Sequence, residues 1–255
     1  MRIVSYNVNG LRAAIKKGLI DWLKENKKID IFCVQETKSH LEQIPVELFE
    51  EIGYNVYWEQ AVKKGYSGVA TFSKTKATKV VNGIGIKKYD IEGRVLRTDF
   101  KDLTVLNIYF PSGSSGEERH KFKVKFLNDL YPEMIELRKK RKKVIVVGDY
   151  NVVHKDLDIH NPTRRDNPSG FRPEEREWMT KWFSTGFNDA FRMKNPKKEE
   201  FSWWSYRAGS RARNKGWRID YISVSDALAD SVKKSGHYQD AVHSDHCPAW
   251  ADIKI

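Results

Sequence analysis

The stretch Lys143–Asn151, K-V-I-V-V-G-D-Y-N, predicts a buried strand around which the rest of the chain can be organised. Its four β-branched residues, Val144–Val147, are typical of a strand inside a sheet. Gly148 ends the apolar run, and Asp149 and Asn151 follow. Functional groups commonly lie just past a strand end, because the strand is rigid and the loop is exposed. An Asx-rich turn explains these residues equally well, so a turn and a site both remain open.

The length and charge of the chain limit the class of protein. With 255 residues and no linker-like stretch, we expect a single domain over residues 1–255. Lysine and arginine number 46 against 34 acidic residues, which gives a formal charge of +12. This charge favours a polyanionic partner, nucleic acid first and an acidic membrane surface second, although a solvated basic surface would also account for it.

The cysteine content and the apolar runs indicate where the protein works. Cys33 and Cys247 are too few for a disulfide framework and match no zinc spacing. No apolar run approaches the roughly 18 residues of a membrane span, and the amino terminus lacks the apolar region of a secretory signal. We therefore expect a cytoplasmic protein, associated with the nucleoid in a prokaryote, that acts without a membrane.

Apolar patterns at the start of the chain predict a strand–helix–strand unit. Arg2–Val8 alternates as a strand, Leu11–Glu25 has leucine or isoleucine at every fourth position, and Ile29–Gln35 is a second apolar run. The two strands of such a unit run in the same direction. Their polar ends, Asn7 and Glu36, should therefore emerge on one side of a sheet.

Helices and short strands are predicted along the rest of the chain. Helices are expected at Leu41–Ile52, Glu117–Lys143 and Pro173–Thr185. Extended runs are expected at Tyr54–Gln60, Gly68–Ser73, Lys79–Gly83, Gly93–Phe100, Leu103–Phe110, Trp217–Val224 and Ala249–Ile255. Glycine-containing breaks between many of the early runs suggest antiparallel neighbours, and His154–Gly170 is expected to be a polar loop. The fold class is α/β, with a two-sheet core and outer helices permitted by the pattern.

Polar side chains stand at or just beyond several of these strand ends. They are Asn7, Glu36, Tyr109, Asp149, Asn151, Asp220, Asp245 and His246. Each alone is better explained as a cap or a turn residue, but the group as a whole is harder to dismiss. Carboxylates with an amide supply the hard oxygen ligands suited to Mg²⁺ or Mn²⁺, and a single histidine without a cysteine ligand argues against zinc.

Seven motifs occur in one order along nearly the whole chain. They are S-Y-N-V-N-G-L-R (Ser5–Arg12), Q-E-T-K (Gln35–Lys38), K-G-Y-S-G-V-A (Lys64–Ala70), I-Y-F-P-S-G (Ile108–Gly113), V-G-D-Y-N (Val147–Asn151), G-W-R-I-D-Y (Gly216–Tyr221) and S-D-H-C-P (Ser244–Pro248). Together they resemble the exodeoxyribonuclease III family of abasic-site endonucleases. The resemblance implies a four-layer α/β sandwich, in which two packed mixed β-sheets are flanked by helices, as in the endonuclease/exonuclease/phosphatase superfamily.

The resemblance also implies an activity and a partner. The activity is metal-dependent hydrolysis of the phosphodiester 5′ to an abasic site in base excision repair, with 3′-5′ exonuclease or 3′-phosphodiesterase activity. The partner is double-stranded DNA with abasic sites or 3′ ends, and the enzyme is expected to act as a monomer. Two alternatives remain open: a phosphodiesterase or general nuclease of the same fold with another substrate, and a DNA-binding module that has lost the chemistry.

Individual roles follow from the matched motifs. Glu36 matches the principal ligand of Mg²⁺, for which Mn²⁺ should substitute, and Asn7 and Asp245 match residues that complete or border the metal site. Asp149 matches the carboxylate that orients or deprotonates the attacking water. Asn151 matches its neighbour, which donates to the phosphate or to that water.

The remaining matches concern the scissile phosphate and the DNA. His246 and Asp220 match a paired histidine and carboxylate, in which the histidine is either a protonated phosphate clamp or a neutral base. Tyr109 matches a phenol near the phosphate. The expected DNA contacts are Tyr66, Ser112, Trp203, Trp217, Arg207 and Arg211, with Arg213 and Lys215 as further phosphate contacts. Without the resemblance, the three aromatic residues of this set would be expected in the core.

Two positions depart from the pattern of the family. Asn9 stands where many relatives carry Asp, so a second metal position is less secure. Ser112 stands where other members carry an Asn that touches phosphate, which changes the expected grip on the abasic phosphate.

Overall fold

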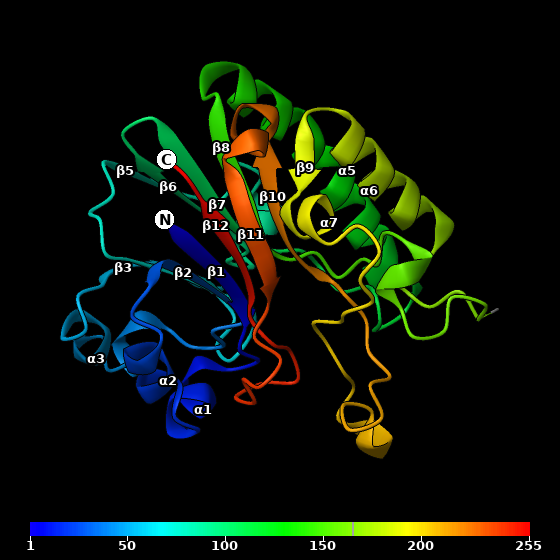
Figure 1. The fold of residues 1–255 in the computed structure, drawn as a ribbon, viewed down its shortest axis with the longest axis horizontal. Helices are drawn as coiled ribbons and strands as arrows, with labels where there is room; N and C mark the ends of the chain where they lie inside the picture. The colour runs from blue at the N-terminus through cyan, green and yellow to red at the C-terminus, as the bar shows by residue number, and fades with distance from the viewer. Residues whose placement is uncertain (165) are drawn as a thin grey trace.

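Two six-stranded sheets form the centre of the protein in the computed structural model, which describes residues 1–164 and 166–255 (Figure 1). The first sheet has the order β11 (Val232–His237), β12 (Ala249–Ile253), β1 (Arg2–Asn7), β2 (Ile29–Gln35), β4 (Val69–Ser73), β3 (Asn55–Glu59). The second has the order β5 (Lys79–Asn82), β6 (Val95–Phe100), β7 (Leu103–Tyr109), β8 (Lys143–Asp149), β10 (Asp220–Ser225), β9 (Phe187–Asp189). Both sheets are mixed, because each contains one parallel pair among antiparallel neighbours.

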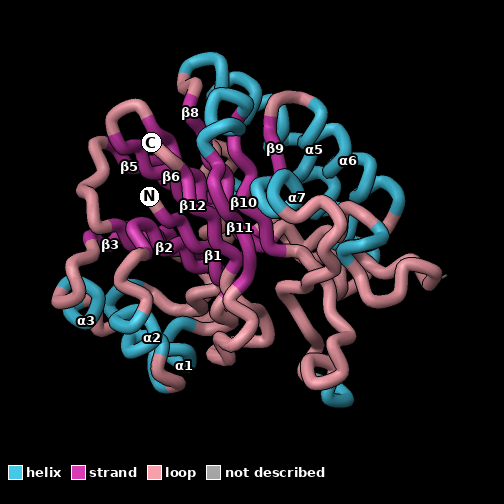
Figure 2. Tube along the Cα trace, in the orientation of Figure 1, coloured by secondary structure: helices cyan, strands magenta, loops and turns pink. Residues whose placement is uncertain are grey.

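Helices lie outside the sheets, as Figure 2 shows. Those packed on the first sheet are α1 (Leu11–Lys16), α2 (Leu19–Glu25) and α3 (Glu47–Glu50). Those packed on the second are α5 (Glu117–Lys140) and α6 (Pro173–Ser184). Shorter helical segments are α4 (Lys87–Asp90), α7 (Ala190–Lys194) and the 3₁₀ turns η1 (Leu41–Gln43), η2 (Asp156–Asp158), η3 (Arg207–Gly209) and η4 (Asp226–Ser231). The predicted four-layer sandwich is confirmed.

Strand β8 shows how the sequence generates these layers. Val144 and Val146 pack under α5 and α6, whereas Ile145 and Val147 face the other sheet. Successive side chains of a strand point to opposite faces, so a continuous apolar run suits a strand that is covered on both sides. The prediction of a buried strand at this position is confirmed, since all four side chains are fully buried.

The parallel pairs place the functional ends of the strands. In β1 and β2, Asn7 lies opposite Gln35, so Glu36 follows at the same edge, as the strand–helix–strand pattern predicts. In β7 and β8, Tyr109 lies opposite Asp149. Strand β10 is antiparallel to β8, and its first residue, Asp220, also pairs with Asp149. The predicted strand at Trp217–Val224 therefore begins later than expected.

Two of the predicted helices are wrong in extent. The helix expected at Leu11–Glu25 is divided into α1 and α2, because Gly18 between them has a φ of 91°. The helix expected at Leu41–Ile52 consists of η1 and the short α3, with Pro45 between them. Proline removes a backbone donor and disfavours a helical residue before it.

Other elements were not visible in the sequence pattern. The sequence analysis missed the short β9 and the edge strand β11, whose exposed Lys233 and Lys234 hide any alternation. Lysines are common on edge strands, where they discourage pairing with another chain. The predicted polar loop His154–Gly170 contains position 165, which lies outside the described residues. In the two described ranges, no helix has both the length and the apolar character that crossing a membrane requires.

Gly148 makes the close approach of β7 and β8 possible, and this contact gives a testable prediction. It has a φ of 153°, and a Cβ atom built there would lie 1.8 Å from the carbonyl oxygen of Ile108. We expect Gly148→Ala to lower the free energy of unfolding by about 3 kcal/mol or more, measured by urea denaturation, because backbone strain and overpacking add. Gly85→Ala is the control, since Gly85 has a φ of 81° with open space around it. It should cost about 1 kcal/mol, and equal losses for the two variants would contradict the steric explanation.

Candidate active site

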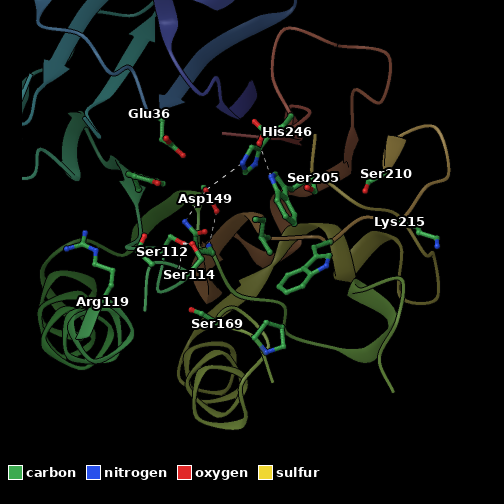
Figure 3. A pocket seen from close by; sticks show the side chains of 18 of the residues that line it. Glu36, Ser112, Ser114, Arg119, Asp149, Ser169, Ser205, Ser210, Lys215 and His246 are labelled. Atoms are coloured by element: carbon green, nitrogen blue, oxygen red, sulfur yellow. Dashed lines mark hydrogen bonds and ion pairs between the residues drawn. The ribbon is translucent and has the colours of Figure 1, made fainter. Parts of the chain in front are cut away.

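A cavity of about 700 Å³ opens at the edge where β2, β7 and β8 end (Figure 3). Eleven of the predicted site residues line it: Glu36, Tyr66, Tyr109, Ser112, Asp149, Asn151, Trp203, Lys215, Trp217, Asp245 and His246. Asn7 and Asp220 are buried, and each hydrogen-bonds a lining residue. Arg207 and Arg211 are not among the residues that line the cavity. The strand ends of both sheets thus contribute to one site.

Asn7 connects the two sheets at the cavity. Its Nδ2 donates to Glu36 Oε1 at 2.9 Å and to Asp149 Oδ2 at 2.8 Å. Its Oδ1 accepts from the backbone N–H of Asn9 at 3.0 Å. The amide therefore turns its nitrogen toward the two carboxylates and bridges them, and its role in completing or bordering the metal site stays a prediction.

Glu36 is held in a constrained position just beyond β2. It has a left-handed φ of 52°, which is uncommon for a residue other than glycine or asparagine. Its Oε2 lies 2.8 Å from the ammonium of Lys38, which also donates to Asn9 Oδ1. Burial alone would raise the pKa of Glu36, but Lys38 and Asn7 bring that pKa below its usual value. The oxygen atoms of Glu36 and Asn9 already bind the ammonium of Lys38, so these oxygen ligands suit a hard cation.

Asp149 has an environment that suits a proton acceptor. Its side chain accepts from Asn7, from the backbone N–H of Asn151 at 2.8 Å and from the side-chain Nδ2 of Asn151 at 3.1 Å. Burial, with the nearby charges of Asp220 and Glu36, raises the pKa of Asp149 to about 7, although His246 opposes this shift. A carboxylate with a pKa near neutrality can both take and return a proton at neutral pH.

Asn151 serves mainly to hold Asp149. It has a left-handed φ of 52°, which asparagine tolerates. Besides its bonds to Asp149, its Nδ2 donates to the carbonyl of Phe110 at 3.0 Å. The sequence analysis predicted that this amide donates to phosphate or water. In the structure its N–H groups are directed at Asp149 and at the end of β7, so they orient the carboxylate.

His246 and Asp220 form the predicted pair. His246 Nδ1 lies 2.8 Å from Asp220 Oδ2, which also accepts from Ser202 Oγ at 2.6 Å. Burial alone would lower the pKa of His246, but Asp220, together with Asp149 and Asp245, raises it to about 10. These carboxylates favour the protonated ring at neutral pH, which is the state that the phosphate-clamp role requires.

A second grouping could also hold a metal. In the described part of the chain, ligand atoms of Asp149, Asp220 and His246 lie within 4.8 Å of one another. A protonated imidazole has no free lone pair to offer a metal, and Asp220 is already engaged by His246. Glu36, where an ammonium is already bound, is the better cation position.

Two arginines that the sequence analysis did not select support the tyrosines of the cavity. Arg94, only 1% exposed, donates to the Tyr109 carbonyl at 3.0 Å and to the Tyr66 hydroxyl at 2.9 Å. Arg119 donates to the same hydroxyl at 2.8 Å, and Glu92 pairs with both arginines. The sequence signal that could have identified Arg94 was E-G-R-V at Glu92–Val95, a charged turn at the start of a strand.

Trp203 and Trp217 form an aromatic wall of the cavity. Their ring centroids are 5.8 Å apart and nearly perpendicular. Trp203 Nε1 donates to Asp245 Oδ2 at 3.0 Å, and the guanidinium of Arg164 lies 5.5 Å from the centroid of Trp217. Both indoles are only partly buried. They line the cavity, which the resemblance implied and which their apolar character alone did not.

The predicted phosphate contacts divide into two kinds. Arg207 is exposed, and Lys215 is exposed at the rim of the cavity. Arg211 instead donates to the carbonyls of Ser244, Gln239 and Ala241 at 3.2, 2.8 and 2.7 Å. These hydrogen bonds brace the loop before Asp245, and the DNA contact expected for Arg211 stays a prediction.

Ser112 and Asp245 complete the set of predicted residues. Ser112 Oγ lies 2.9 Å from Ser114 Oγ at the cavity wall, so two hydroxyls stand where one was expected. Asp245 accepts from Asn9 Nδ2 at 3.0 Å and from Ser244 Oγ at 3.1 Å. Asn9 thus connects Asp245 to Lys38.

Comparisons with known proteins agree with this geometry. The model of the endonuclease/exonuclease/phosphatase family matches residues 4–246. An exodeoxyribonuclease of Bacillus subtilis is 43% identical over the full length of both chains. The structure of an AP endonuclease from Archaeoglobus fulgidus superposes with a TM-score of 0.92 at 31% identity, and that of a 3′ phosphatase from Neisseria bound to a product DNA hairpin with 0.92 at 25%, each covering both chains completely. The chain belongs to the endonuclease/exonuclease/phosphatase family, and within it to the exodeoxyribonuclease III type.

Proposed function

We propose that the protein is a Mg²⁺-dependent repair nuclease that cleaves the phosphodiester 5′ to abasic sites in duplex DNA and also trims 3′ ends. The observation that carries the proposal is the placement of Glu36 and Asp149, one from each sheet, on the two sides of the Asn7 amide in one cavity. This places a cation position and a proton acceptor on neighbouring parts of the same cavity. The names of the similar proteins, exodeoxyribonuclease, AP endonuclease and 3′ phosphatase, support these substrates.

The residues divide the work of hydrolysis between them. Glu36 would hold Mg²⁺, with Mn²⁺ as a substitute, and Asp245 would border it. When bound, the metal neutralises phosphate charge and assists the leaving 3′ oxygen. Asp149 takes the proton of the attacking water, and the imidazolium of His246 holds a phosphate oxygen.

The wall of the cavity would select the substrate. Trp203 and Trp217 can receive the sugar that has no base, because their ring faces offer it apolar contact. A normal nucleotide would instead stay stacked in the duplex. Tyr66, whose hydroxyl accepts from Arg94 and Arg119, also lines the cavity. The basic surface would contact DNA phosphates, and we propose that a monomer suffices, since one chain supplies every proposed catalytic residue. We propose the cytoplasm as its location.

Replacing the proposed metal ligand tests the cation position. We expect Glu36→Gln to reduce cleavage of an abasic duplex by roughly 10²- to 10³-fold in Mg²⁺, because an amide holds the cation poorly. EDTA should abolish cleavage by the parent enzyme. Glu133→Gln, an exposed substitution on α5, is the control and should keep the parent rate. Near-normal cleavage by Glu36→Gln would overturn the assignment.

Replacing Asp149 by its amide keeps the shape and removes the charge. Asp149→Asn should reduce the single-turnover rate by roughly 10²- to 10⁴-fold, because the amide cannot take a proton. Binding of an abasic duplex in EDTA, measured by fluorescence anisotropy, should be retained or tightened, since a negative charge near the phosphate is lost. Retained activity would leave Asp149 only the role of aiming the water.

The salt dependence of binding tests the basic rim. The affinity for an abasic duplex should fall steeply with salt, and the logarithmic slope decreases by about 0.9 for each phosphate contact that is removed. We expect that reduction for Arg207→Ala and for Lys215→Ala. Lys140→Ala, at the far end of the 24-residue α5, should leave the slope unchanged. A flat salt dependence for the parent enzyme would exclude this loop as a phosphate-binding surface.

A further inference from the structure

We propose that Lys123 and Glu175, a fully buried ion pair beneath the cavity, are positioning residues that hold Asn151 and through it aim Asp149. The inference rests on the proposed function, because it concerns the residue assigned there as the proton acceptor. Neither residue belongs to the motifs that carry the family resemblance. Neither lines the cavity.

Lys123 hydrogen-bonds the loop that follows β8. Both members of the pair are 0% exposed, and their charged atoms lie 2.5 Å apart. The ammonium also donates to the backbone carbonyl of Asn151 at 2.7 Å. That residue has a left-handed φ of 52° and directs both its backbone and side-chain N–H groups at Asp149. The lysine therefore holds the carbonyl of the residue whose backbone and side-chain N–H groups orient the carboxylate of Asp149.

Glu175 connects the same ammonium to the loop before α6, which also contributes to the cavity lining. Its Oε2 accepts from the backbone N–H groups of Gly170 and Arg172 at 2.6 and 3.0 Å, and its Oε1 accepts from Ser169 Oγ at 3.2 Å. Ser169 lines the cavity (Figure 3). Val153 N–H in turn donates to the Gly170 carbonyl at 2.7 Å, so the two loops are bonded directly as well.

The pair holds two loops that no regular element constrains. Asn151 stands past the end of β8, and Ser169 and Gly170 precede α6. The fit is tight, because a Cβ on Gly170 would lie 2.9 Å from the Asn151 carbonyl oxygen. Small misplacement of a catalytic group costs rate steeply, so a rigid support under Asn151 acts on the chemical step more than on binding.

Four variants separate positioning from stability: Lys123→Met, Glu175→Gln, the double variant and Asp99→Asn. A buried charge left without its partner is destabilising, so each single variant of the pair should lose more Tm than the double variant. Lys123→Met should lower kcat on an abasic duplex by roughly 10- to 100-fold with KM changed less than about 2-fold. The double variant should regain Tm but keep the low kcat, because no ammonium remains at the Asn151 carbonyl.

Asp99→Asn provides the matched control. Asp99 is a buried carboxylate that accepts from Arg97 and Thr104, at the end of β6 and β7 away from Tyr109. The Asp99→Asn variant should have a lower Tm and an unchanged kcat. If Lys123→Met does not fold, the double variant carries the test alone.

Two results would overturn the inference: a kcat for Lys123→Met within about 2-fold of the parent enzyme, or a kcat that returns together with Tm in the double variant. Asp149→Asn, measured alongside, separates the two levels of the argument. An active Asp149→Asn would remove the role of Asp149 as the base. An inactive Asp149→Asn with a normal Lys123→Met would remove only the positioning role of the pair.

Discussion

The apolar contact between the inner faces of the two sheets is the constraint on which the active site depends. Ile31 of one sheet and Val105, Ile145 and Val147 of the other belong to one buried cluster. At the site end of this cluster, Gln35 Nε2 donates to Asn107 Oδ1 at 2.7 Å across the sheets. Sliding one sheet over the other would leave these buried amides unpaired, which costs more than losing apolar contact alone.

The electrostatics of the site contrast with those of the whole chain. The formal charge of the chain is +12, yet the cavity holds the carboxylates of Glu36, Asp149 and Asp245. Around them, Lys38 and a protonated His246 supply positive charge. A basic surface attracts DNA over distance, whereas an acidic centre repels its phosphates at contact. A hard cation resolves this conflict, because it is attracted by the carboxylates and attracts the phosphate.

Local sequence chemistry predicted some features well and others poorly. The continuous apolar run of β8 and the parallel pair of β1 and β2 were predicted, because apolar pattern and chain direction are local properties. The single helix predicted at Leu11–Glu25 was wrong, because the backbone at Gly18 takes a left-handed conformation within an otherwise helical pattern. Arg211 was selected for its charge, but its partners are three carbonyls about 30 residues away in the chain.

The sequence by itself determined the α/β class through the periodicity of its apolar residues. Its ordered motifs, through the family resemblance, determined the layering, the family and most of the residues that meet in the cavity. Only the tertiary structure decided what each residue does there. It turned the Asn7 amide nitrogen toward two carboxylates, raised the pKa of His246 through the carboxylates around it, and placed Lys123 against the Asn151 carbonyl. Hydrogen-bond direction, burial and the field of nearby charges depend on neighbours distant in the chain, and no local pattern records them.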